Sequence, residues 1–183
     1  MKIKVTDFIV FGTCAILCGT ATITIPALSA LDTSVEAITF YSYHDNNPPN
    51  SRAIKYPKVH KEAGGRGTYE DPITIAVPES FPAKPGTWLY VRGLQKYMIV
   101  EDLCGDSPCG DHGTQNFIDV WMESNEKNNK EVVKKCQEKW TKRTRDGDLP
   151  KAVVFDPPKN LPVNTTPFFD TKTNKCNEPP KGW

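Results

Sequence analysis

Residues 97–122 read YMIVEDLCGDSPCGDHGTQNFIDVWM, and this stretch decides which fold the sequence predicts. Two runs of β-branched and aromatic residues, 97–103 and 117–122, are typical of strands, and the polar, glycine-containing segment between them is typical of a loop. Each run carries an aspartate, Asp102 at the end of the first and Asp119 in the middle of the second. These acids are either a reactive pair or part of the turn chemistry around a disulfide.

The same alternation of strand-like runs and turn-forming segments continues on the N-terminal side of this stretch. Short runs rich in β-branched and aromatic residues alternate with turn-forming residues from 37 to 122, which predicts five or six strands in about 85 residues. The runs are AITFYSY, ITIAV, TWLYV, YMIVED and FIDVWM. Because the runs are closely spaced, little room is left for crossover helices, and the sequence predicts a mainly β fold, a compact barrel or sandwich.

The N-terminal segment 1–30 predicts export. A start containing lysines, a run of apolar or small residues and the ending ALSA together are typical of a secretory signal peptide. A membrane anchor is the alternative, because the run 8–30 approaches the length of a bilayer span, but its glycines, its threonines and Pro26 weaken it as a membrane helix.

Removal of the leader brings the formal net charge from +1 to zero, because Lys2, Lys4 and Asp7 leave with it. The remaining chain has no basic tract that alternates with aromatic residues, which argues against a nucleic-acid binder. It also has no second apolar span. We therefore expect a secreted, extracellular monomer with no nucleic-acid partner, no membrane attachment after processing and no cofactor.

Four cysteines follow the leader, an even number that predicts disulfides in an oxidising compartment. Spacing favours Cys104 with Cys109, closing a tight loop, and Cys136 with Cys176, pinning the C-terminal segment, although four cysteines allow three connectivities. The spacing does not repeat a paired zinc-ligand pattern, so no metal site is predicted. Asn164, in Asn-Thr-Thr, is predicted to be a glycosylation acceptor.

Two further segments follow the strand-rich region. Residues 125–147 are highly charged with one apolar stripe, which predicts an amphipathic helix packed on the β domain, its lysines forming a solvated face. Residues 148–183 are rich in proline, and we expect an extended tail pinned by Cys176. The stripe consists of Val132, Val133, Cys136 and Trp140.

The segment 67–122 resembles the three-aspartate module, a double-psi β-barrel found in lytic transglycosylases and related cell-wall proteins. The resemblance implies a six-stranded double-psi β-barrel over residues 37–124. The matching elements, in the family's order, are Asp71-Pro72, Pro85-Gly86-Thr87 with Tyr90-Val91, Asp102, and Ile118-Asp119-Val120-Trp121.

A second similarity is to plant expansins, barwin-like proteins and a small endoglucanase family, which share that barrel. Thr39-Phe40-Tyr41 and Phe117-Ile118-Asp119 resemble two of their strands, and the resemblance implies that Asp119 is the acid. The endoglucanase base would fall at Tyr43, and the nearest acid is Asp45. The loop between Asp102 and Asp119 is longer than the corresponding link in the three-aspartate family, so the shape of the groove and the substrate stay open.

Glycoside cleavage needs a carboxylic acid that stays protonated near neutral pH, usually with a second carboxylate. Asp119 has apolar sequence neighbours, and desolvation together with Asp102 would raise its pKa. We therefore predict Asp119 as general acid and Asp102 as its catalytic partner. The structural alternative is that both acids only accept backbone hydrogen bonds. Further substrate-binding residues, three of them aromatic faces for sugar rings, are predicted to be Tyr41, Asp45, Trp88 and Tyr90.

Other polar residues are interpreted as structural. Asp71, which precedes a proline, is expected in a turn, and His44, His60 and His112 are expected on surface loops because no catalytic histidine motif includes them.

Three functions remain open. The first is a secreted enzyme that cleaves polysaccharide, the second a wall-binding or wall-loosening module, and the third a disulfide-stiffened protein binder such as a protease inhibitor or a secreted effector. The favoured prediction is a carbohydrate-directed protein that binds or cleaves cell-wall glycan.

Overall fold

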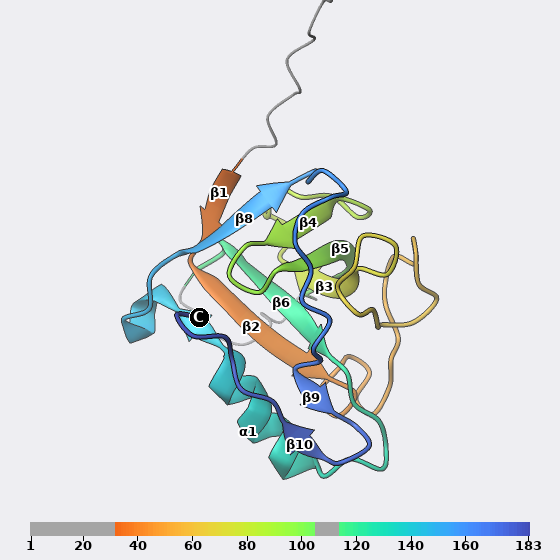
Figure 1. Ribbon diagram of the computed structural model, residues 1–183. Helices are drawn as coiled ribbons and strands as arrows, with labels where there is room; N and C mark the ends of the chain where they lie inside the picture. Colours follow the sequence, from red (N-terminus) through yellow and green to blue (C-terminus); the bar gives the residue numbers. More distant parts are fainter. Residues whose placement is uncertain (1–31, 105–113) are drawn as a thin grey trace, which may run out of the picture.

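The computed structural model describes residues 32–104 and 114–183, which form a mainly β structure with one α-helix in that part of the chain (Figure 1). Eight strands make one sheet in the order β1-β8-β4-β5-β3-β6-β2-β7, and two short strands make a separate hairpin. The strands are β1 (Asp32–Val35), β2 (Ala37–Ser42), β3 (Ile73–Val77), β4 (Trp88–Val91), β5 (Lys96–Leu103), β6 (Phe117–Met122), β7 (Lys142–Arg143), β8 (Lys151–Phe155), β9 (Phe169–Asp170) and β10 (Lys175–Cys176).

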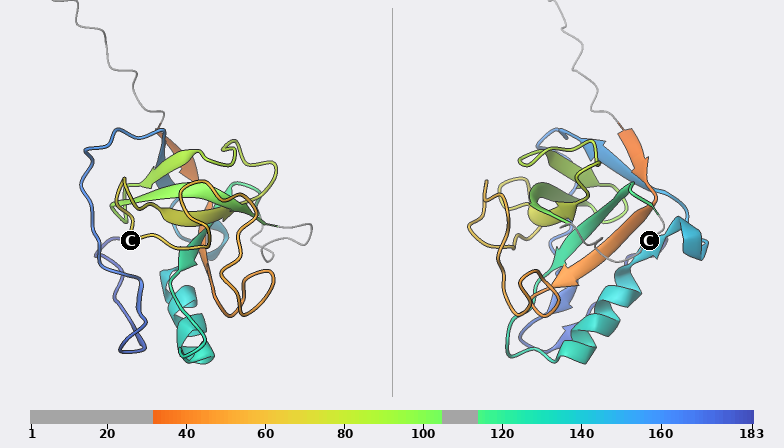
Figure 2. Two further views of the ribbon diagram at one scale, coloured as in Figure 1. Left: turned by 90° about the vertical axis from the view of Figure 1, so that its right-hand side faces the viewer. Right: turned by 180° about the vertical axis from the view of Figure 1, so that it is seen from behind.

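The eight-stranded sheet is curled, because β1 and β2 follow each other in sequence, yet β1 is the first strand in the sheet order and β2 is the last but one. One residue, Glu36, connects them. Its N–H donates to the carbonyl of Asn116 (2.8 Å), and its carbonyl accepts from the N–H of Thr144 (2.8 Å). The two ends of the sheet are thereby brought together, and the two turned views show the strands wrapping around a common interior (Figure 2).

The centre of the sheet combines parallel and antiparallel pairs. Strands β2 and β6 are parallel, as are β3 and β5, while β3 and β6 run antiparallel. Every residue of β2, β3 and β6 is buried, so both faces of these strands are covered, as is usual where parallel strands lie inside a fold. On one face, Phe40 of β2 packs edge-on against Phe168 with ring centroids 4.9 Å apart.

A β-bulge interrupts β5 next to the two central acids. Ile75 of β3 pairs with Val100, but the following Ala76 pairs with Asp102, so Glu101 is an extra residue on the β5 side. A bulge changes the direction in which neighbouring side chains point and is common beside functional sites. Here it lets two consecutive acidic residues enter two different buried environments.

The predicted amphipathic helix is confirmed but is shorter than 125–147. Helix α1 (Lys130–Trp140) begins after Asn129, whose side chain accepts the N–H groups of Glu131 and Val132, a standard N-cap. It ends at Thr141, because the chain becomes extended there and enters β7. A 3₁₀ helix, η1 (Thr144–Asp146), follows. The buried side chains of α1 include Val133, Cys136 and Trp140 from the predicted stripe.

The expectation that 148–183 is only an extended tail is wrong for its first part. Strand β8 pairs with β1 on one side and with β4 on the other, so it is an internal strand of the sheet. The β-branched pair Val153 and Val154 is fully buried there. The surrounding prolines hid this short strand in the sequence, and the sheet therefore draws on more of the chain than residues 37–124.

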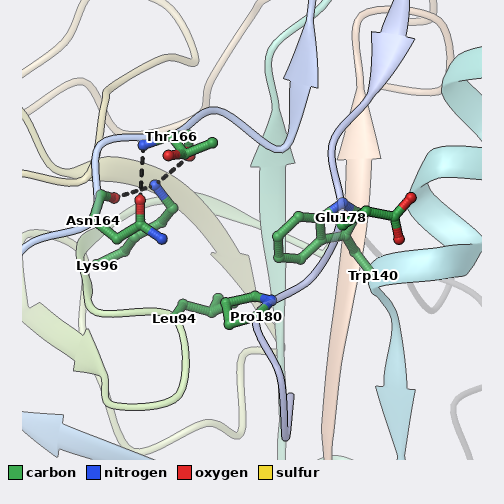
Figure 3. Close-up of a pocket in the computed structure, with 7 residues that line it drawn as sticks. All are labelled: Leu94, Lys96, Trp140, Asn164, Thr166, Glu178 and Pro180. Carbon is green, nitrogen blue, oxygen red and sulfur yellow. Dashed lines mark hydrogen bonds between the residues drawn. The ribbon is translucent and has the colours of Figure 1, made fainter.

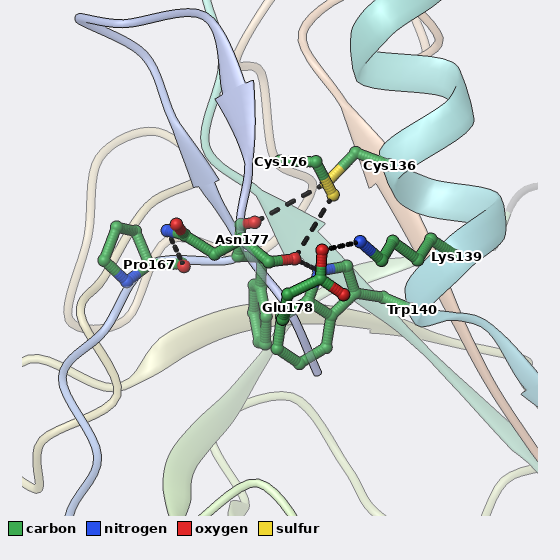
Figure 4. Close-up of a disulfide and its surroundings, with 8 residues drawn as sticks. Cys136, Lys139, Trp140, Pro167, Cys176, Asn177 and Glu178 are labelled. Atoms are coloured by element: carbon green, nitrogen blue, oxygen red, sulfur yellow. Dashed lines mark hydrogen bonds and ion pairs between the residues drawn. A yellow bond between two sulfur atoms is a disulfide. The ribbon is translucent and has the colours of Figure 1, made fainter. Parts of the chain in front are cut away.

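The rest of the C-terminal segment does run extended along the outside of the sheet and is pinned as predicted (Figure 1). Cys136 of α1 and Cys176 of β10 form a disulfide with Cα atoms 5.4 Å apart (Figure 4). Cys104 is also disulfide-bonded. Its favoured partner, Cys109, lies outside the described residues, as do the predicted signal peptide 1–30 and His112. Between residues 32 and 183, leaving out 105–113, no helix has the length and apolarity needed to span a bilayer.

Candidate functional site

Asp119 lies at the centre of a row of residues that crosses four strands. In the sheet register it is the partner of Thr39 on β2 and of Ala76 on β3. Its Oδ1 accepts a hydrogen bond of 2.7 Å from the Thr39 hydroxyl. Among the described residues, 32–104 and 114–183, the Asp119 carboxyl group makes no other hydrogen bond. The residue is only 7% exposed. Asp119 is therefore a buried acid with a single donor.

Asp102 occupies the same row on the other side of Ala76, because Ala76 is also its register partner. Neighbouring strands are spaced about 4.8 Å apart, so the Cα atoms of the two aspartates are about 10 Å apart. Directly paired residues point to the same face of a sheet, so Asp102 and Asp119 lie on the same face, on either side of the buried Ala76. Oδ1 of Asp102 accepts the N–H groups of Leu103 (2.9 Å) and Lys55 (3.1 Å).

Burial shifts both acids towards the protonated form. Desolvation raises the pKa of Asp119 to about 7, and the negative charges of Asp45 and Asp102 add to this, while the Thr39 hydrogen bond and Arg143 oppose it. Desolvation also raises the pKa of Asp102, against the backbone N–H groups that it accepts. Desolvation is the main cause of the raised pKa of Asp119, and the assignment of this residue as general acid stays a prediction.

Tyr41 brings an unpaired hydroxyl to the same group. Its side chain is buried, and its OH makes no hydrogen bond of normal geometry to the described residues, although it lies close enough to Asp102 for the two to interact. Burial, with the charges of Asp102, Asp119 and Glu101, raises the pKa of the phenol well above its usual range. A buried hydroxyl without a well-placed partner is costly, so this group is a candidate contact for a ligand.

The remaining predicted substrate contacts do not form an aromatic platform. Tyr41 stands edge-on to Trp121 inside the protein, and Tyr90 is buried with its hydroxyl donating to the carbonyl of Pro162 (2.7 Å), so the prediction that either offers an open face is wrong. The C-terminal segment covers Tyr90, which the sequence did not reveal. Trp88 is half-buried and stacks on Tyr69 with ring centroids 4.3 Å apart.

Asp45 is exposed but held in place. Its Oδ1 accepts the N–H and the hydroxyl of Ser42, both at 2.8 Å, and the carboxylate also accepts the side-chain amide of Gln137 from α1. It lies near enough to raise the pKa of Asp119. Asp45 is therefore a charged neighbour of the row rather than one of its members.

A second carboxylate cluster was missed by the sequence analysis. Glu101, whose side chain is 0% exposed, accepts five hydrogen bonds, three of them from consecutive backbone N–H groups. Because so many donors offset the cost of burial, its pKa is lowered to about 2. The donors are the N–H groups of Lys58, Val59 and His60, the His60 ring and the Thr74 hydroxyl.

His60 joins Glu101 to Asp71. Its Nδ1 lies 2.7 Å from Oε2 of Glu101 and its Nε2 lies 3.1 Å from Oδ1 of Asp71. A ring bonded to two carboxylates carries a proton on each nitrogen, and the Glu101 hydrogen bond accordingly raises the pKa of His60 against the effect of burial. The expectation of a free surface histidine is wrong. Asp71 does lie in a turn, and its carboxylate also binds Arg66.

These contacts fasten the long β2–β3 loop to the row. The loop binds Glu101 through residues 58–60 and Asp102 through Lys55, and Arg52 forms an ion pair with Glu123 just beyond β6. The adjacent acids Glu101 and Asp102, which follow the apolar run 97–100 of β5, were the signal for this cluster, because a strand buried on both faces buries both of them.

Two further sites were considered from the sequence, a metal site and a glycosylation site at Asn164. Within the described ranges no group of three or more His, Cys, Asp or Glu side chains is arranged to hold a metal ion. Asn164 is half-buried, and its side-chain oxygen accepts the N–H of Thr166 at 3.0 Å. Its glycosylation remains a prediction.

The family described as the DDB_G0273701 N-terminal domain matches residues 33–177. The chain belongs to this family. A relative from Dictyostelium discoideum, "Uncharacterized protein DDB_G0273701/DDB_G0273221", is 32% identical over 146 residues, which is 78% of this chain and 60% of that protein. The chain thus spans less than two thirds of the relative's length. No solved structure matches the chain.

The range of the DDB_G0273701 N-terminal domain coincides with the folded unit. It opens within β1 and closes one residue after Cys176, so it includes the acid row, the His60 cluster, the internal strand β8 and the disulfide. The C-terminal segment is therefore part of the domain itself rather than an appendage to it.

Proposed function

We propose that this protein is a secreted enzyme that cleaves cell-wall polysaccharide, with Asp119 as the general acid. The observation that supports it best is the state of that side chain: buried, bonded through one oxygen to Thr39, and with its pKa raised to about 7. A carboxylic acid that keeps its proton near neutral pH is what protonation of a glycosidic oxygen requires.

Asp102 would serve as the second carboxylate. It lies on the same face of the sheet at a Cα spacing of about 10 Å, which is compatible with the separations of about 5 to 9.5 Å between the carboxyl groups of glycosidases. Its two backbone donors favour the ionised form more than the single hydroxyl donor of Asp119 does. The division of roles is therefore Asp119 as proton donor and Asp102 as stabiliser of developing positive charge or as base.

The Tyr41 hydroxyl would bind the substrate beside Asp102. It lies close to the Asp102 carboxyl group but makes no hydrogen bond of normal geometry to the described residues, so a sugar hydroxyl or the attacking water would give it a well-placed partner. Trp88 is the remaining predicted aromatic contact with partial exposure. No cofactor is needed for this chemistry, because the two carboxylates supply both the proton and the charge.

The finer fold assignment belongs to the same proposal. Two parallel pairs, β2·β6 and β3·β5, linked by the antiparallel β3·β6 pair, are compatible with a double-psi β-barrel, and this arrangement supports the resemblance to the three-aspartate module and the expansins. Export, an extracellular site of action and a glycan substrate follow from the leader and from that resemblance, not from the fold alone.

The test is product release by the disulfide-bonded protein from peptidoglycan, chitin and β-glucan, measured as new reducing or anhydro sugar ends. Asp119→Asn should abolish release while circular dichroism shows the fold intact. Asp156→Asn is the matched control, because Asp156 is exposed and lies outside the row, and it should retain full activity. Product from the Asp119 variant would refute the assignment. Binding to glycan without any product from the wild type would instead support the wall-binding alternative, and capture of a protein target without glycan binding would support the inhibitor or effector alternative.

A further inference from the structure

A pocket of about 180 Å³ lies between the start of β5, the end of α1 and the C-terminal segment (Figure 3). Leu94, Trp140 and Pro180 form apolar walls, and Lys96 is the cation that lines it. Lys96 and Asp102 are six residues apart on β5, so their Cα atoms are about 20 Å apart at 3.3 Å per residue. This pocket is therefore separate from the Asp119 row, and any ligand that it binds is independent of the proposed enzyme activity.

Lys96 is buried to an extent that is unusual for a lysine. It is 2% exposed, and Gly67 packs so tightly on its stem that a Cβ on that glycine would lie 3.0 Å from the lysine Cβ. Its Nζ donates to the carbonyls of Asn164 (2.6 Å) and Thr166 (2.9 Å), as Figure 3 shows. The ammonium also lies 5.2 Å from the centroid of the Phe168 ring.

These contacts leave the charge incompletely compensated. An ammonium group has three N–H donors, and the two carbonyls use two of them. Within residues 32–104 and 114–183 no carboxylate forms a salt bridge with Lys96, and desolvation alone accounts for the lowering of its pKa to about 8. The one acid that lines the pocket, Glu178, is instead paired with Lys139 and has 81% of its side chain exposed.

A purely structural role does not explain this choice of residue. Tying the 164–166 segment to β5 needs two N–H donors, and a neutral amide would supply them without the cost of a buried charge. A positive charge at the wall of a pocket is explained when an anionic ligand completes its coordination. The third N–H and the absent counter-charge both point to such a ligand.

The volume of the pocket and its apolar walls indicate the size and polarity of the part of the ligand that does not contact Lys96. An apolar cavity of about 150 Å³ is enough to hold benzene, so this pocket holds one six-membered ring with a small substituent. Trp140 and the two aliphatic walls favour an apolar body over a sugar rich in hydroxyls. We propose that the pocket binds a small carboxylate with a ring-sized apolar body, its carboxylate accepting from Lys96 and its ring lying against Leu94, Trp140 and Pro180.

The experiment is a titration of the intact, disulfide-bonded protein with benzoate, followed by two-dimensional NMR and by tryptophan fluorescence at pH 7. Benzamide is the neutral comparison of nearly the same shape. We expect saturable binding of benzoate, at least about tenfold weaker binding of benzamide because it lacks the charge, and shifts confined to residues around Trp140.

Three variants accompany the wild type. Lys96→Gln removes the charge but keeps an N–H donor, and Pro180→Phe fills the pocket from a half-exposed wall; each should weaken benzoate binding at least about tenfold. Lys175→Met removes an exposed charge on β10 and should bind as the wild type does. Should Lys96→Gln fail to fold, Pro180→Phe and the benzamide comparison decide. The proposal is overturned if the wild type shows no saturable benzoate binding, if benzamide binds equally well, or if either folded pocket variant binds unchanged.

Discussion

Replacing Asp119 with asparagine should make the protein more stable at neutral pH, not less. Asparagine keeps an oxygen that can accept the Thr39 hydroxyl, but it cannot ionise. In the wild type the residue is 7% exposed and its carboxyl group accepts the Thr39 hydroxyl, so ionisation in the folded state is opposed by desolvation. The substitution removes that opposition without creating a cavity.

The magnitude follows from the pKa difference between the folded and unfolded states. Burial raises the pKa of Asp119 from 3.8 to about 7. The unfolded chain therefore releases this proton first as pH rises, and the wild type loses stability from about pH 4 up to about pH 7. Relative to the wild type, Asp119→Asn should gain under about 1 kcal/mol at pH 4 and about 4 kcal/mol at pH 8, since each pKa unit corresponds to about 1.4 kcal/mol.

The assay is urea unfolding of both proteins, with disulfides intact, followed by tryptophan fluorescence at pH 4, 5, 6, 7 and 8. Comparing the two proteins at each pH cancels the contributions of Glu101 and His60, which titrate in both. Glu126→Gln controls for removing one negative charge from the surface, because Glu126 is exposed. A difference that does not change with pH, or a variant that is less stable than the wild type at pH 8, would show that Asp119 is an ionised scaffold residue and would refute the assignment as acid.

Three further predictions test neighbouring features. Glu101→Gln should lower the free energy of unfolding by about 3 kcal/mol at pH 7, measured by urea unfolding, because the pKa of Glu101 lies at about 2 instead of 4.5. This loss should vanish as pH falls from 4.5 towards 2, and a loss that does not change with pH in that range would contradict the prediction. Thr39→Val should raise the pKa of Asp119 further, seen by ¹³C NMR titration of its carboxyl carbon, because the variant removes a donor that favours ionisation; an unchanged midpoint would contradict the proposed contact. Joint replacement of Cys136 and Cys176 by serine should lower the free energy of unfolding by about 4 kcal/mol, since the disulfide closes a loop with a sequence separation of 40; chemical denaturation would reveal a smaller loss if the unfolded chain is compact without it.

The sequence was sufficient for the strands that hold the acid row. Runs such as ITIAV and FIDVWM have strong β propensity and turn residues on both sides, so strands β3 and β6 were predictable from local pattern. The apolar neighbours of Asp119 likewise indicated a buried acid, because a fully buried strand leaves no polar face for it. Local information decides both features.

Features that depend on distant contacts were not predictable. Three of the donors to Glu101 come from residues 58–60, which lie more than forty positions away in the chain, and only the folded loop brings them together. The same reason explains the error at Tyr90, whose hydroxyl is bonded to Pro162 in a segment that looked like a loose tail. Tyr90, which the sequence pattern suggested as a substrate contact, instead holds the C-terminal segment in place.

Two buried carboxylates in this region, Glu101 and Asp119, have pKa values shifted in opposite directions. Glu101 receives five hydrogen bonds and its pKa falls to about 2, whereas Asp119 receives one and its pKa rises to about 7. The fold therefore has donors available and supplies them to one acid but not to the other. A scaffold acid gains stability from every donor that it receives, whereas Asp119 has only the Thr39 hydroxyl among residues 32–104 and 114–183. This difference is the physical basis of the role proposed for its proton.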